Sequence, residues 1–96
     1  MANLSFEWDK DKNSLNQKKH GISFEEAQTV FVDDNALLLH DPDHSLKEDR
    51  FLLLGLSSNL RIMVVYHCYR KKDDIIRIIS VRKATRSEQK QYWKRW

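Results

Sequence analysis

The chain has 96 residues, of which 41% are hydrophobic and 32% are charged. This length and composition predict a single domain, residues 1–96, with one modest core rather than a disordered segment. The sequence has no run of about 18 apolar residues, which excludes a membrane-spanning helix, and its one cysteine, Cys68, excludes an internal disulfide. The first residues lack the basic and then apolar pattern of a secretory signal, so we expect a cytoplasmic protein.

Charge is distributed unevenly along the chain. Residues 1–60 carry 6 Lys and Arg against 11 Asp and Glu, whereas residues 61–96 carry 11 against 3. The basic part also contains five aromatic residues, namely Tyr66, Tyr69, Tyr92, Trp93 and Trp96. This combination suits a polyanion with stackable bases, and it equally suits an acidic protein partner.

The first third of the chain predicts a short strand and two helices. Residues 6–8 alternate in polarity as a strand does, and Asp9 can cap a helix that runs to about His20 and ends at Gly21. That helix is mostly polar, with Leu15 as its main apolar anchor, so we expect it on the surface. A capping box at residues 23–26 then begins a second helix, which has apolar residues at helical spacing.

The remainder predicts four strands and a final helix. Strands are expected at residues 36–40, 50–56, 61–69 and 75–83, with a polar turn at 41–43 and a charged hairpin loop at 70–74. A second capping box, Thr85 to Glu88, opens the last helix. The order β-α-α-β-β-β-β-α predicts an α+β fold in which helices pack against a mostly antiparallel sheet.

Two arginines interrupt the most apolar of these strands. Arg77 and Arg82 lie among four isoleucines and a valine in residues 75–82, where a guanidinium is costly unless it meets an anion. That anion is either an internal carboxylate or a phosphate. The two positions have opposite parity, so in a regular strand they point to opposite faces. Either a bulge lies between them or only one belongs to a site.

Metal and nucleotide sites have little support in the sequence. Asp41, Asp43 and His44 offer possible ligands, but their spacing matches no specific metal site and a polar turn explains them better. There is no glycine-rich phosphate loop, which argues against nucleoside triphosphate chemistry. We therefore expect neither a metal nor an organic cofactor.

Several blocks, taken in order, resemble the BrnT toxin family of bacterial type II toxin–antitoxin modules. They are Phe6–Asp9, Lys19–Ala27, Val30–Phe31, Asp33, Asp43–Ser45, Asp49–Phe51, Gly55 and Ile78–Thr85. The resemblance extends from Phe6 to about Tyr92. It departs from the family at Asp34, where proline is frequent, and at Val81, where alanine is common, and neither position could perform chemistry. It implies a RelE-like fold, ribonuclease activity and a cognate ribbon-helix-helix antitoxin of the BrnA type, with which a heterotetramer would form.

Metal-independent RNA cleavage through the ribose 2′-hydroxyl would provide a catalytic role for the arginines. The enzyme must stabilise charge on the phosphorane-like transition state, and the planar guanidinium fork suits that because it binds two oxygens and stays protonated. Arg50, Arg77 and Arg82 come from neighbouring predicted strands, so the sheet could bring them to one patch. We take all three as catalytic candidates.

Two further residues are candidates for proton transfer. His67 has the right side-chain type, since imidazole titrates near pH 6.5, although a structural role for this histidine at the sheet edge is the favoured alternative. Glu48 precedes Asp49 and Arg50, and it could act as a general base or orient Arg50. We favour orientation.

RNA binding is expected from basic and hydroxyl side chains near these residues: Lys19, Ser80, Lys83, Arg86 and Lys90. Solvated faces of a helix or strand are the alternative for each lysine and arginine. The aromatic stripe of the last helix is more typical of a core than of a base-stacking platform. The basic, arginine-bearing sheet predicts polyanion binding, and the resemblance to the BrnT family implies an endoribonuclease toxin that inhibits translation and growth. The alternative is a non-catalytic module that binds RNA or protein.

Overall fold

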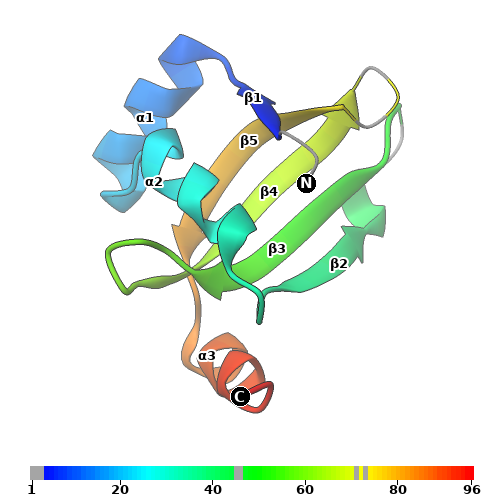
Figure 1. Cartoon of the computed structure of the whole chain (residues 1–96). Coiled ribbons are helices and arrows are strands. Elements are labelled where there is room, and N and C mark those ends of the chain that lie inside the picture. Colours follow the sequence, from blue (N-terminus) through cyan, green and yellow to red (C-terminus); the bar gives the residue numbers. More distant parts are fainter. Residues whose placement is uncertain (1–3, 45–46, 71, 73) are drawn as a thin grey trace.

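Five strands form one mixed sheet in the order β1-β5-β4-β3-β2 (Figure 1). The computed structural model describes residues 4–44, 47–70, 72 and 74–96. The strands are β1 (Ser5–Glu7), β2 (Leu37–Asp41), β3 (Arg50–Leu56), β4 (Ile62–Arg70) and β5 (Ile75–Lys83). β1 pairs in parallel with β5 and every other pairing is antiparallel. The predicted α+β class and element order are confirmed, and residues 45, 71 and 73 of the predicted loops and blocks lie outside the described residues.

Local capping chemistry explains where the helices begin and end. They are α1 (Lys10–His20), α2 (Phe24–Thr29) and α3 (Arg86–Trp93), with short 3-10 turns η1 (Val30–Val32) and η2 (Pro42–His44). Asp9 accepts the backbone N–H groups of Asp11 and Lys12, and Gly21 ends α1 in the left-handed conformation at φ 69°. None of the described helices has the length and apolarity needed to cross a membrane.

The two predicted capping boxes differ in outcome. At α3 both halves form, because Thr85 and Glu88 exchange side-chain and backbone hydrogen bonds. At α2 only Ser23 caps the helix, accepting the N–H of Glu26 at 3.1 Å. The Glu26 carboxylate instead binds Arg61, whose Nε lies 2.9 Å away. This ion pair holds the pKa of Glu26 below its usual range despite burial and ties α2 to the turn between β3 and β4.

The anchor of α1 is polar, which corrects the prediction for Leu15. Leu15 is 64% exposed, whereas Asn13 and Asn16 are each only 7% exposed. The Asn16 amide donates to the carbonyl of Val81 at 2.9 Å and accepts the N–H of Val81 at 3.1 Å. β1 covers only residues 75–77 of β5, so Asn16 pairs with the part of that edge which lacks a neighbouring strand.

A bulge in β5 resolves the parity of the two arginines. Ser80 pairs with Tyr66 but Ile78 pairs with His67, so Ile79 is an extra residue without a partner on β4. Across the sheet, Arg77 lies opposite Cys68 and Arg82 opposite Val64. Because side chains alternate along β4, the bulge places Arg77, Ser80 and Arg82 on one face. We call this the arginine face, and the opposite one the core face.

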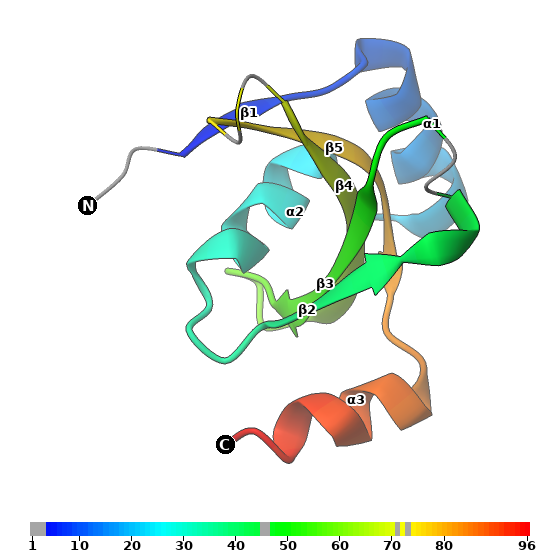
Figure 2. The same cartoon turned by 90° about the vertical axis from the view of Figure 1, so that its right-hand side faces the viewer.

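Helices cover the two faces unequally. α2 and η1 lie on the core face, α1 lies beside β5, and α3 lies beyond one end of the sheet (Figures 1 and 2). The main core joins apolar side chains of α2 and η1 to those of the core face: Phe24, Ala27, Val30, Leu53, Met63, Val65, Ile76, Ile78 and Val81. β3 and η1 approach each other closely at Gly55. A Cβ at this position would lie 2.7 Å from Cγ1 of Val30, so only glycine fits.

A smaller cluster fixes α3 against one end of the arginine face. Tyr92 is fully buried with Leu54, Val64 and Ala84, and its hydroxyl donates to Asp33 at 2.7 Å. Burial alone would raise the pKa of Asp33, but hydrogen bonds from Leu56 N–H and from Tyr92 outweigh it and lower the pKa. The aromatic stripe of α3 is therefore core at Tyr92 and surface at Trp93 and Trp96, which are 50% and 66% exposed.

Candidate nucleic-acid interface

The arginine face carries a polar cluster centred on Arg82. Its Nε donates to the hydroxyl of Tyr66 at 3.2 Å, and its terminal nitrogens donate to the two carboxylate oxygens of Glu88 at 2.8 and 3.0 Å. One terminal nitrogen also donates to the carbonyl of Lys83 at 3.2 Å. The Arg82 guanidinium, mainly through these hydrogen bonds, holds the pKa of Glu88 at about 2, and the pair raises the pKa of Arg82. Arg82 therefore has an internal carboxylate partner and also a place at the surface.

Arg77 lies nearer the other end of the same face. It donates to Glu7 of β1 at 2.8 Å, and the Nε of Arg70 lies 3.5 Å from the same carboxylate. One acidic group thus faces two guanidiniums, and Asp9 also lies within electrostatic reach of Arg77. The partners of Arg77 and Arg82 on β4 are four positions apart, so the two arginines stand roughly 13 Å apart along the strand.

Arg50 and Glu48 belong to the same end of the sheet as Arg77. Arg50 is half-buried at the start of β3 and lies opposite Cys68 on the arginine face. Glu48 is exposed just before β3 and accepts a hydrogen bond from the Cys68 thiol at 3.5 Å. Burial, and then the Glu48 charge, raise the pKa of that thiol. Cys68 is fully buried, which agrees with a structural role.

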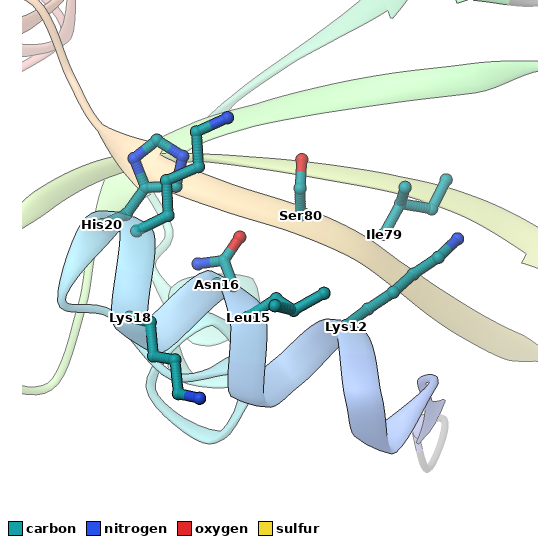
Figure 3. Close-up of a pocket in the computed structure, with 8 residues that line it drawn as sticks. Lys12, Leu15, Asn16, Lys18, His20, Ile79 and Ser80 are labelled. Atoms are coloured by element: carbon teal, nitrogen blue, oxygen red, sulfur yellow. The ribbon is translucent and has the colours of Figure 1, made fainter.

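An open groove of about 610 Å³ runs between α1 and the free edge of β5. It is lined by Lys12, Leu15, Asn16, Lys18, Lys19, His20, Ile79 and Ser80. In Figure 3, Lys12 and Leu15 point from α1 toward Ile79 and Ser80, whereas Lys18 points away from them. Two predicted RNA contacts, Lys19 and Ser80, therefore line the same groove. On β5 the groove is bordered by Ile79 and Ser80, which lie at the bulge.

The other predicted RNA contacts lie where β5 passes into α3. Lys83 ends β5, Arg86 begins α3 and Lys90 follows one turn later, and all three side chains are exposed. Because Glu88 lies between Arg86 and Lys90 and binds Arg82, the start of α3 is joined to the centre of the arginine face. Basic side chains thus lie at the groove, at Arg82, whose charge is paired with Glu88, and on the exposed side of α3.

His67 is the one predicted catalytic residue that lies apart from the others. It points to the core face and is fully buried, with Phe31 and Tyr69 rings at 4.9 and 5.2 Å from its own. Nδ1 lies 3.0 Å from the Val65 carbonyl and so must carry the proton, which leaves Nε2 to accept from the Tyr69 hydroxyl at 3.2 Å. Desolvation lowers the pKa of His67. A buried neutral imidazole with both nitrogens bonded agrees with a structural role.

The polar turn near β2 is held by histidine–carboxylate contacts. His44 lies 2.9 Å from Asp41, and His40 lies 3.2 Å from Asp49. Within the described residues there is no group of three or more His, Cys, Asp or Glu side chains that could hold a metal ion.

Two members of the Arg82 cluster were not among the predicted site residues. Tyr66 faces Ser80 across β4 and β5, and only the register, with its bulge, places its hydroxyl beside Arg82. Glu88 carried a signal in the sequence, because its capping position three residues after Thr85 fixes it near the end of β5.

A comparison with protein families decides the identity of the chain. Residues 8–88 match the family described as the ribonuclease toxin BrnT of type II toxin–antitoxin systems. The chain belongs to the BrnT family. This match confirms the resemblance that was stated from the residue blocks. A toxin of this family has RNA as its substrate and an antitoxin as its partner.

A solved structure supports the fold of this BrnT family member. The crystal structure of the Brucella abortus ribonuclease toxin BrnT superposes with a TM-score of 0.66 at 23% sequence identity, covering 88% of this chain and 100% of that chain. At this identity the likeness concerns the fold. No curated protein matches the chain.

Proposed function

We propose that this chain is an endoribonuclease toxin that cleaves RNA through the ribose 2′-hydroxyl without a metal ion. Cleavage would inhibit translation and growth. The observation that carries the proposal is the β5 bulge, which places Arg77, Ser80 and Arg82 on one face of the sheet in a chain of the BrnT family. A regular strand would place the two arginines on opposite faces of the sheet.

In this mechanism the arginines act on charge rather than on protons. Arg82 would lie beside the cleaved phosphate and stabilise the negative charge of its transition state. Arg77 and Arg50, roughly 13 Å or more along the face from Arg82 by strand geometry, would bind neighbouring phosphates. Glu48 is exposed and bonded to Cys68, and we assign it an orienting role at that end. His67 is left out because it is buried behind the sheet.

The RNA strand would follow the basic side chains along this surface. Lys19 and Ser80 would contact it at the groove between α1 and β5, whereas Lys83, Arg86 and Lys90 would contact it near α3. Phosphate contacts of this kind position a nucleic acid without reading its bases. Each neutralised phosphate releases counterions, so binding should weaken with rising salt.

The test is cleavage of an RNA oligonucleotide by the purified chain in the presence of a chelator. We expect cut RNA with 2′,3′-cyclic phosphate and 5′-hydroxyl ends. A matched oligonucleotide with deoxyribose at the mapped site should stay intact, because it lacks the nucleophile. Cleavage of both oligonucleotides would contradict the 2′-hydroxyl mechanism, and cleavage abolished by the chelator would contradict metal independence. RNA that is retarded but uncut would indicate the non-catalytic module instead.

We also propose that a BrnA-type ribbon-helix-helix antitoxin neutralises the toxin by covering the arginine face, within a heterotetramer. Arg82, Arg86 and Lys90 lie together on that face and on the start of α3, so a segment rich in carboxylates would be complementary to it. Direct cover of these residues needs no conformational change in the toxin.

Inhibition kinetics and charge reversal test the antitoxin proposal. Inhibition should be competitive with RNA, and Arg82→Glu combined with Lys90→Glu should weaken the complex, while light scattering should give the mass of a heterotetramer. Lys10→Glu, at the exposed start of α1, reverses one charge outside the group of Arg82, Arg86 and Lys90 and serves as the control. A complex that leaves Arg82 open to RNA would contradict the proposal.

A further inference from the structure

The hydrogen-bond capacity of Arg82 is almost used up within the protein. A guanidinium has five N–H donors. Four of them are taken in this structure, by the Tyr66 hydroxyl, by the two oxygens of Glu88 and by the Lys83 carbonyl. A two-pronged grip on a phosphate requires two N–H groups, so Arg82 can form one only by giving up a bond to one of these three partners. The Glu88 carboxylate is itself held by the Thr85 N–H at 2.8 Å, which keeps this arrangement rigid.

Tyr66 is in the opposite situation. Its oxygen accepts from Arg82, and among the described residues no acceptor takes its own O–H proton. The ring packs against the small core cluster that includes Leu54, Val64 and Tyr92, which fixes its position while the hydroxyl remains at the half-buried surface. Ser80 stands directly opposite on β5, and Ser80 also lines the groove. The Tyr66 phenol is therefore a donor that is available on the arginine face, beside the guanidinium of Arg82.

We propose that Tyr66 is the general acid of the cleavage reaction, an inference that rests on the proposed function. The 2′-oxygen forms a bond to phosphorus and releases its proton to solvent, the bond from phosphorus to the 5′-oxygen breaks, and that oxygen takes the Tyr66 proton. The phenolate keeps the electron pair of its O–H bond and regains a proton from solvent. Arg82, held by Glu88, stabilises the charge on the phenolate through its Nε–H and the charge on the phosphate through its remaining donor.

The decisive variant is Tyr66→Phe, which removes only the hydroxyl and keeps the ring that packs against the core cluster. General acid catalysis contributes about 100-fold to 10,000-fold, so cleavage of ordinary RNA should fall by about 100-fold or more. The matched control is Tyr69→Phe, which removes a hydroxyl from the core face, where Tyr69 donates to His67, and should cleave at the wild-type rate. Circular dichroism should give the same folded signal for both variants.

A second substrate separates proton donation from binding. Once the cleaved bond is mapped, its 5′-oxygen is replaced by sulfur, which departs as a thiolate without needing a proton because thiols ionise near pH 8.5, about seven units below alcohols or water. Tyr66→Phe should cleave this RNA within a few-fold of the wild-type rate. An equal loss on both substrates would overturn the general acid in favour of phosphate binding, and an unchanged rate on ordinary RNA would overturn any role. In both cases the wild type still cuts, so the proposed function stands. Wild-type protein that cuts neither RNA would overturn both.

Discussion

Tyr66 and His67 are neighbours in the sequence, yet they belong to opposite faces of the sheet with opposite chemistry. The His67 face is covered by α2 and η1, and its polar groups are satisfied internally, with the imidazole bonded at both nitrogens. The arginine face is covered only at one end by α3, and its charges are paired at the surface, as in Arg82 with Glu88. In this fold the cover over a face decides whether a titratable residue is open to a ligand at the surface, and residue type alone does not.

The largest expected effect comes from removing charge on the open face. Arg82→Ala should lower RNA cleavage by about 100-fold to 1,000-fold, by analogy with the loss of one oxyanion donor, about 2.7–4 kcal/mol. Its ion pair with Glu88 is partly exposed, so stability should fall by only about 1 kcal/mol. Cleavage assays and urea unfolding measure the two quantities. Lys10→Ala removes one charge from the exposed start of α1 and should change neither, whereas an Arg82 variant with wild-type activity would remove the functional contrast between the faces.

The next effect concerns the strand edge that borders the groove. Asn16→Ala leaves both backbone groups of Val81 and the carbonyl of Ile22 without their partner. A buried polar group left unsatisfied costs about 1–3 kcal/mol, so we expect a loss of about 2 kcal/mol or more in urea unfolding. Leu15→Ala, one position earlier and mostly exposed, should stay within about 0.5 kcal/mol of the wild type. Equal losses in the two variants would restore Leu15 as an anchor of α1.

The smallest effect is a pH dependence on the covered face. In the unfolded chain His67 takes up a proton near its ordinary pKa of 6.5, whereas burial lowers its pKa in the folded state. Acid therefore favours the unfolded chain, and stability should fall as the pH drops below about 6.5, at up to about 1.4 kcal/mol per pH unit, until the folded pKa is reached.

His67→Gln checks this contribution because a neutral amide has no proton to gain. Between pH 7 and 5.5 its urea midpoint should vary less with pH than that of the wild type. Cleavage per folded molecule should show the same pH profile in both proteins. If His67→Gln instead flattened the cleavage profile and left the stability profile unchanged, the imidazole would have to reach the RNA, and the contrast between the faces would fail.

Local signals in the sequence located most elements of the fold. The β-branched run at residues 75–83 matches β5 residue for residue, and Asp9, Gly21 and Thr85 mark helix ends as predicted. These features depend on neighbours a few residues away, so they can be read directly. The α1 anchor could not, because the polar pattern of α1 contains no trace of the bonds that Asn16 makes with Val81, 65 residues away.

The sequence by itself determined the order of elements, the basic character of the last third and the membership of Arg77 and Arg82 in one strand. Only the tertiary structure decided that both arginines share a face, that His67 lies behind it and that Tyr66 and Glu88 complete the cluster. The physical reason is the alternation of side chains along a strand, in which one extra residue reverses the face of everything beyond it. The bulge at Ile79 arises from pairing with β4 and has no local signature, so chemistry on this sheet is set by contacts between strands.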